Sequence, residues 1–154
     1  MSNSPNSPIR LRSGQALIKI QMPNDSDKKK IYDIEERSAR FGEEVIDWVG
    51  KLPRNDITNR LISQLVASAT SIGANYCEAD CAESNKDFIH KMSIANKEAK
   101  EAKHFIRMLS RACPIHAAEG RRLWKEAHEL NLILVTIVRK AKETEEKKKI
   151  EDNN

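Results

Sequence analysis

Apolar and small residues recur in this chain at alternating intervals of three and four, and the pattern returns in four successive segments. Side chains spaced in this way lie on one face of an α-helix, with a period near 3.5 residues. In the first segment this face consists of Ile31, Ile34, Ser38, Phe41, Val45, Trp48 and Leu52. Gly50 and Pro53 mark its end. The spacing therefore predicts an amphipathic helix with one buried face.

The other three segments predict three more helices. The second starts near Asn55 or Asp56, either of which can cap a helix, and the third stops before Pro114. The predicted buried positions are Ile62, Leu65, Ala69, Ile72, Tyr76 and Ala79; then Phe88, Met92, Ala95, Ala99, Ala102, Ile106 and Leu109; then Leu123, Trp124, Ala127, Leu130, Leu134, Ile137 and Ala141. Residues 130–138 are apolar nearly all round, more than one buried face requires.

Four helices of roughly 20–30 residues with short connections pack antiparallel. We therefore predict an all-α fold, an up-down-up-down four-helix bundle, over residues 30–146. Residues 1–29, rich in Ser, Asn, Pro and charge, are expected to be a disordered tail, and residues 147–154 a charged fraying tail. Aromatic residues at 5% and charged residues at 32% agree with a helical protein.

Charge and hydropathy set limits on function. The net charge of +4 is a mild bias toward anionic partners. No apolar run reaches the roughly 18 residues of a membrane span. Arg10, Arg12 and Lys19 interrupt any signal-peptide core near the N-terminus. We expect a cytoplasmic protein with no membrane partner.

Metal and catalytic motifs are weak. Cys77 and Cys81 lie one helical turn apart, so a zinc half-site is conceivable, but buried or half-buried free thiols are the favoured interpretation for these residues and Cys113. A di-metal site needs Glu-x-x-His pairs on different helices, whereas the pairs ending at His90 and His104 fall on one helix. The sequence has no P-loop and no nucleophile elbow. We predict no metal, no cofactor and no enzymatic activity.

A polar stripe follows the apolar face in the second and third helices. Residues 68–80 read SATSIGANYCEAD. On a heptad their polar side chains meet the matching flank of the next helix, which places Glu78 near Lys91 and Ser71 near Glu98. A solvated polar face is the alternative, and we favour a network in which small residues let the helices approach and polar ones satisfy buried carboxylates. Its members are Ser68, Ser71, Asn75, Glu78, Lys91, Glu98 and Glu101.

A basic stripe occupies the outward positions of the third helix. Its residues are spaced 3, 4, 3, 4, and further cations begin the fourth helix across a short loop. Clustering on one face is the electrostatic pattern of anion binding, although a solvated helix face is the commoner role of such charges. The candidate nucleic-acid-binding residues are Lys97, Lys100, His104, Arg107, Arg111, Arg121, Arg122 and Lys125.

The segment SATSIGANYCEAD, followed by DFIHKMSIANKEAKEAKHFIRML, resembles a known family. It is the four-helix-bundle family of proteins encoded in intervening sequences of bacterial large-subunit ribosomal RNA genes. The resemblance covers about residues 35–140 and is sharpest at 68–101. Ala67 and Asp80 stand where the family usually has Arg and Gly.

The resemblance implies a four-helix bundle that assembles as a ring-like homopentamer. It also implies a relationship to the retroelement accessory variability protein, which binds nucleic acid and a reverse transcriptase through a basic surface. Two interpretations follow. One is a non-catalytic oligomer that binds nucleic acid, RNA in particular, with a reverse transcriptase as a further partner. The other is a protein–protein scaffold that does not bind nucleic acid directly.

Overall fold

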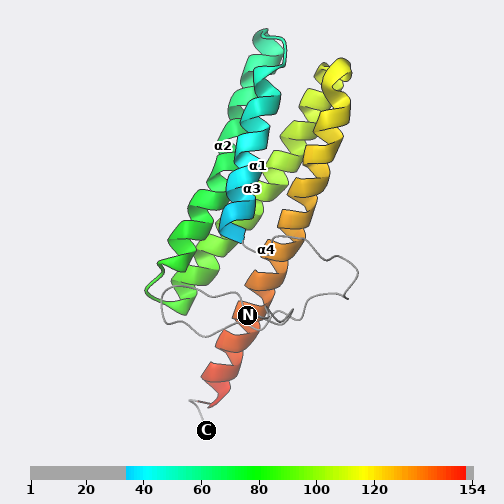
Figure 1. Cartoon of the computed structure of the whole chain (residues 1–154). Helices are drawn as coiled ribbons and strands as arrows, with labels where there is room; N and C mark the ends of the chain where they lie inside the picture. The colour runs from blue at the N-terminus through cyan, green and yellow to red at the C-terminus, as the bar shows by residue number, and fades with distance from the viewer. Residues whose placement is uncertain (1–33, 152–154) are drawn as a thin grey trace, which may run out of the picture.

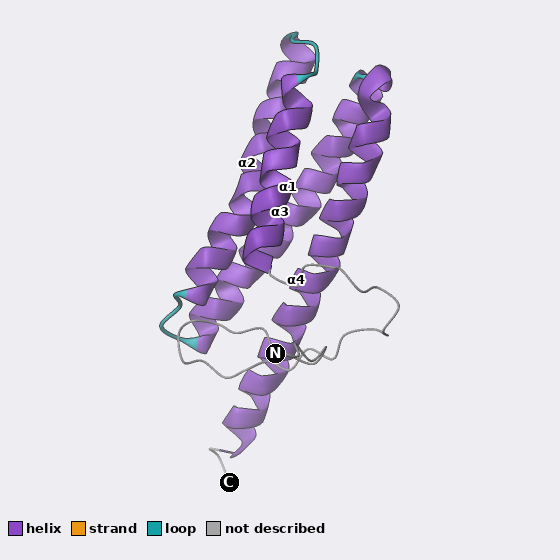
Figure 2. Ribbon diagram, viewed as in Figure 1, coloured by secondary structure: helices purple, strands orange, loops and turns teal. Residues whose placement is uncertain are grey.

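The part of the chain that the structure describes folds into four α-helices and one short 3-10 turn (Figure 1). The computed structural model describes residues 34–151, and the predicted N-terminal tail lies outside them. In order, the elements are α1 (Ile34–Gly50), α2 (Asp56–Asp80), α3 (Asn85–Ala112), η1 (Pro114–His116) and α4 (Ala117–Glu151). Within the described residues no strand interrupts the helices (Figure 2). The predicted all-α up-down-up-down bundle is confirmed.

Side-chain caps fix where α2 and α3 begin. The Asn55 side chain accepts hydrogen bonds from the backbone N–H groups of Ile57 and Thr58, each at 3.0 Å. In return the Thr58 hydroxyl accepts from the Asn55 N–H, which completes a capping box. Ser84 caps α3 by accepting from the N–H of Asp87 at 3.1 Å. Asn55, not Asp56, is therefore the residue that starts α2.

The predicted apolar faces form a single core. Alanines line much of the α3 side of it, and the absence of larger side chains there lets α3 lie close to both α2 and α4. Trp124, predicted in the buried face of the fourth helix, is half-buried at its edge instead. The largest fully buried side chains include Phe41, Trp48, Leu65, Ile72, Met92, Ile106, Leu109, Leu123, Leu130 and Leu134.

The upper end of the bundle is closed by Trp48. Its ring is fully buried, and its Nε1–H donates to the backbone carbonyl of His116, 3.2 Å away, which ties the end of α1 to η1. The ring lies directly against Gly120 in the first turn of α4: a Cβ at Gly120 would come within 2.8 Å of Trp48 Cζ2. A side chain at position 120 would displace this contact.

At the other end, α4 extends beyond the other three helices (Figure 1). The Asn85 amide donates to Glu145 Oε2 at 2.6 Å, which joins the start of α3 to α4. Past this point the helix continues to Glu151 with exposed side chains. No helix among residues 34–151 is long and apolar enough to cross a membrane.

Candidate nucleic-acid interface

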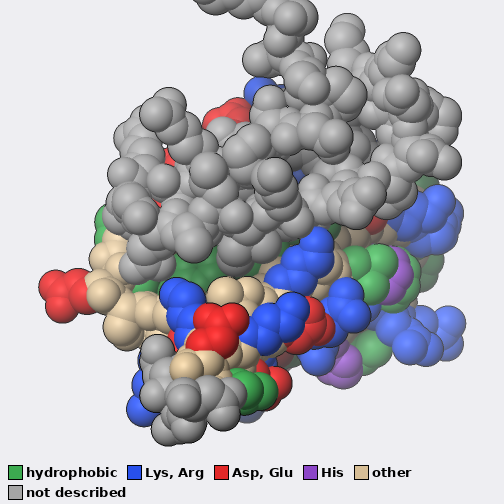
Figure 3. Space-filling model, turned by 90° about the horizontal axis from the view of Figure 1, so that it is seen from below, with side chains coloured by type: hydrophobic (Ala, Val, Ile, Leu, Met, Phe, Trp, Pro, Cys, Tyr) green, Lys and Arg blue, Asp and Glu red, His purple; other side chains and the backbone are tan. Residues whose placement is uncertain are grey.

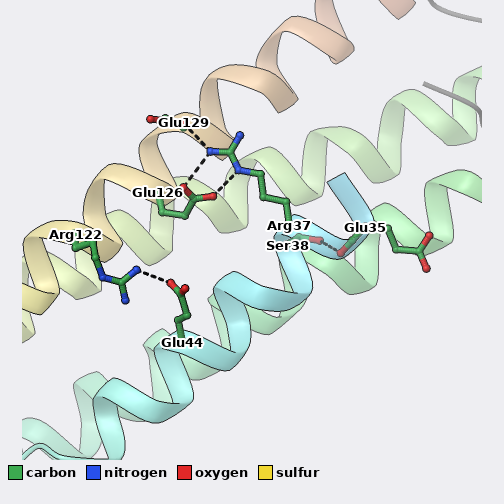
Figure 4. A network of polar contacts seen from close by, with 7 residues as sticks. All are labelled: Glu35, Arg37, Ser38, Glu44, Arg122, Glu126 and Glu129. Atoms are coloured by element: carbon green, nitrogen blue, oxygen red, sulfur yellow. Dashed lines mark hydrogen bonds and ion pairs between the residues drawn. The ribbon is translucent and has the colours of Figure 1, made fainter. Parts of the chain in front are cut away.

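The carboxylates of the first two-thirds of α4 are directed toward α1. Glu126 and Glu129 both accept hydrogen bonds from the guanidinium of Arg37, at 2.5 Å and 2.7 Å (Figure 4). The hydrogen bond that Arg37 donates to Glu126 is the main reason that the pKa of Arg37 lies above its ordinary value. Nearer the start of α4, Glu119 pairs with Lys51, the residue after α1, at 3.0 Å. These are the three carboxylates of α4 between residues 117 and 142.

Arg122 belongs to this same α1–α4 seam. Its Nη1 lies 2.8 Å from Glu44 Oε2, and Figure 4 shows its side chain directed toward α1. Of the eight candidate nucleic-acid-binding residues, Arg122 is the one that forms an ion pair with a different helix. It is half-exposed, so the pair is solvated and weak.

Two further cations of α4 take no part in these ion pairs. Arg121 and Lys125 are exposed, one turn apart. On α3 the predicted row is exposed along its whole length. A carboxylate does reach this row, since Glu101 Oε1 lies 3.7 Å from Lys97 Nζ, a long and exposed contact. Figure 3, viewed along the bundle, shows Lys, Arg and His side chains with hydrophobic ones between them at its right-hand edge.

Three residues that were not among the predicted nucleic-acid-binding residues lie between the two rows. The Trp124 and His128 rings of α4 stack with centroids 5.3 Å apart and an interplanar angle of 20°. Lys103 of α3 places its Nζ 5.1 Å from the Trp124 centroid and 3.1 Å from His128 Nδ1. The spacing signal was present: Trp124 and His128 are four apart, and Lys103 falls between Lys100 and Arg107 at helical intervals.

We define the basic face as these exposed and half-buried cations with the aromatic pair between them. It comprises Lys97, Lys100, Lys103, His104, Arg107 and Arg111 of α3 with Arg121, Trp124, Lys125 and His128 of α4.

The predicted polar stripe has a different organisation. Glu78 and Lys91 do pair across the α2–α3 turn, with 2.5 Å between Oε2 and Nζ. The buried Ser68 hydroxyl, however, donates to the Leu65 carbonyl of its own helix at 3.1 Å. Asn75 likewise donates to the backbone carbonyl of Ser71 at 2.9 Å. These side chains therefore form hydrogen bonds with the α2 backbone and not with carboxylates of α3.

Two other members of the predicted stripe lie on the α3 side. Glu98 is half-buried, and burial, followed by the nearby Glu101 charge, raises the pKa of its carboxyl. On α2 the small residues also serve the contact with α1, since a Cβ at Gly73 would lie 3.1 Å from the Ser38 hydroxyl. The small residues thus allow close packing on more than one side of α2.

The cysteines are free thiols, but two differ from expectation. Cys113 is buried, whereas Cys77 and Cys81 are exposed near the end of α2. Desolvation, followed by the charges of Glu35 and Asp80, raises the pKa of Cys77, which disfavours the reactive thiolate. Within residues 34–151 no three His, Cys, Asp or Glu side chains gather as ligands for a metal ion.

This arrangement defines a class of protein, a small antiparallel four-helix bundle with ion pairs between α1 and α4 and a basic face formed by α3 and α4. Residues 30–136 match the family described as 23S rRNA-intervening sequence protein, and the chain belongs to that family. It is also similar to a crystal structure of a protein of unknown function from the S23 ribosomal protein family of Bacteroides thetaiotaomicron VPI-5482. The two share 30% sequence identity and a TM-score of 0.63, with 69% of this chain and 95% of that chain covered. No curated protein matches the chain.

Proposed function

We propose that this protein is a non-catalytic, oligomeric four-helix bundle that binds nucleic acid, RNA in particular, through the basic face. The observation that carries the proposal is the separation of charge on α4. Its carboxylates Glu126 and Glu129 pair with Arg37 of α1 and Glu119 pairs with Lys51 just after α1, while Arg121 and Lys125 are exposed. A face of cations from two helices, with the α4 carboxylates engaged in ion pairs near α1, suits the phosphate backbone of a nucleic acid.

The side chains of the face are suited to binding. Lysine and arginine donate hydrogen bonds to phosphate oxygens and neutralise their charge, which positions a nucleic acid without reading its sequence. Repetition of the face in each subunit of an oligomer would turn a weak contact into avidity. The family name refers to 23S rRNA, which makes RNA the first ligand to test. A reverse transcriptase is a further candidate partner on the strength of the resemblance.

The test is a salt titration of binding to one hairpin RNA and one duplex DNA. The test variant is Lys100→Glu/Arg107→Glu, because both residues are exposed. Loss of phosphate contacts should weaken binding to both nucleic acids and reduce the salt slope by roughly one unit per contact. A matched control is Arg40→Glu/Arg54→Glu, which makes the same charge change at exposed positions of α1 and the following loop.

Equal weakening in both double variants would assign the effect to net charge rather than to the basic face. If the wild-type protein binds neither nucleic acid at low salt, the basic face is a solvated surface. The scaffold interpretation then replaces the proposal.

A further inference from the structure

The aromatic pair in the basic face has no role in simple phosphate binding. The described residues include six Phe, Trp and Tyr side chains, of which only Phe105 and Trp124 reach the surface; the buried ones are Phe41, Trp48, Tyr76 and Phe88. Phe105 is edge-on to His104, with ring centroids 5.4 Å apart. Trp124 is the tryptophan that lies between two rows of cations.

Lys103 and His128 hold this tryptophan in place. A lysine ammonium can only donate, so the 3.1 Å contact of Lys103 Nζ with His128 Nδ1 is a hydrogen bond in the tautomer that carries its proton on Nε2. The same ammonium lies 5.1 Å from the Trp124 centroid, within the range of a cation–π contact. Stacking of Trp124 on His128 adds a second constraint. The surface tryptophan is thus preorganised before any ligand arrives.

We propose, on the basis of the nucleic-acid function above, that Trp124 and His128 form a stacking site for an unpaired nucleobase. Lys100, Arg107 and Arg121 hold the phosphates on either side of that nucleotide. Each lies three or four residues from Lys103 or Trp124, which places it one helical turn away. An aromatic ring set in a cationic groove is the arrangement by which proteins bind single strands.

This inference commits to single-stranded nucleic acid. Bases in a duplex are already stacked and paired, so only their phosphates can reach the basic face. An unpaired base offers both its phosphates and a free ring face to Trp124. Binding of a single strand should therefore depend on bases and phosphates, and binding of a duplex on phosphates alone.

The full chain is tested against three RNA probes of equal strand length: an oligouridylate, the same backbone with abasic positions, and a duplex. The abasic strand keeps every phosphate and removes every ring. Wild-type protein is expected to bind the oligouridylate roughly 5- to 150-fold more tightly than the abasic strand. Equal affinity for these two strands would overturn the stacking site and leave the proposed function intact. Absence of binding to all three would overturn both.

Substitutions of Trp124 test whether this residue is responsible for the preference for the oligouridylate over the abasic strand. Trp124→Leu should bring oligouridylate affinity down to that of the abasic strand, while Trp124→Phe should retain most of the preference. Phe105→Leu, at the other surface aromatic, is the matched control and should retain the preference. Base stacking should also quench the fluorescence of Trp124, whereas the buried Trp48 responds little, so quenching should be absent in Trp124→Phe. An equal loss for all three probes in Trp124→Leu would contradict the proposal.

Discussion

Asn131 of α4 donates a hydrogen bond of 2.5 Å to the side chain of Asn96 in α3. Asn131 is only 8% exposed, and its neighbours Leu130 and Leu134 are fully buried. A polar pair with one buried member is satisfied in one register of the two helices and left unpaired in the others. The pair therefore helps to specify how α3 and α4 align, together with the Asn85–Glu145 and Lys103–His128 contacts.

Removal of Asn96 should be costly because it leaves a buried amide without a partner. We expect Asn96→Ala to lower the free energy of unfolding by about 1–3 kcal/mol. Urea denaturation monitored by circular dichroism measures this. The control Asn59→Ala, at an exposed position of α2, should stay within about 0.5 kcal/mol of wild type. Indistinguishable midpoints for the two variants would mean that water replaces the Asn96 side chain.

The helices themselves were predictable from sequence because burial imposes a period on side chains. Phe41, Leu65, Met92 and Leu134 lie in the core as their spacing predicts. The contacts of residues at the edge of a buried face are harder to predict, since a small rotation of the helix decides what they contact. Trp124 has the spacing of a core residue, yet it lies at the α3 edge and contacts Lys103.

Partners distant in sequence could not be predicted. Arg37 and Glu126 are 89 residues apart, and neither carries a local signal of the other. The pairing of Arg122 with Glu44, 78 residues away, also has no local signal, so Arg122 is equivalent to Arg121 in the sequence. The helix backbone also competes for short polar side chains, and the predicted network did not include this. Ser68 and Asn75 donate hydrogen bonds to backbone carbonyls of their own helix, as short polar side chains in helices often do.

The contact of Trp48 with Gly120 leads to a second stability prediction. A methyl group at position 120 would overlap the indole and the Ser110 hydroxyl, so Gly120→Ala should destabilise the protein by about 1–3 kcal/mol. Gly50→Ala is the matched control, because no atom lies within 4 Å of a Cβ at that position. It should be neutral or slightly stabilising. Thermal unfolding of both variants tests the prediction, which fails if their melting temperatures shift alike.

The environment of Glu98 predicts a pH dependence. Burial and the Glu101 charge raise the pKa of this carboxyl in the folded state above its unfolded value. The folded protein therefore binds more protons in that window, and the contribution of Glu98 to stability falls as pH rises through it. Glu98→Gln should be more stable than wild type at pH 7, and the difference should vanish below the unfolded pKa of about 4.3.

Denaturant unfolding of wild type and Glu98→Gln between pH 4 and pH 7 measures this difference. Glu43→Gln, at an exposed position of α1, is the control for loss of a negative charge. A Glu98→Gln variant that is less stable than wild type at pH 7 would show that the carboxylate has a favourable partner.

Leu132 and Val135 predict self-association through α4. The apolar run 130–138 uses Leu130, Leu134 and Ile137 in the subunit core, which leaves Leu132 51% and Val135 43% exposed. Adjacent exposed apolar side chains on a helix are a candidate contact between subunits. Light scattering at micromolar concentration should give the mass of an oligomer, with a pentamer expected from the resemblance.

Leu132→Glu/Val135→Glu should shift the measured mass toward the monomer, because association would bury two unpaired charges per subunit. Ile115→Glu is the control, since Ile115 is an apolar residue 93% exposed in η1 at the far end of the bundle. It should leave the mass unchanged. A wild-type protein that is monomeric at micromolar concentration would refute association, and an oligomer that survives the double substitution would place the contact on another face.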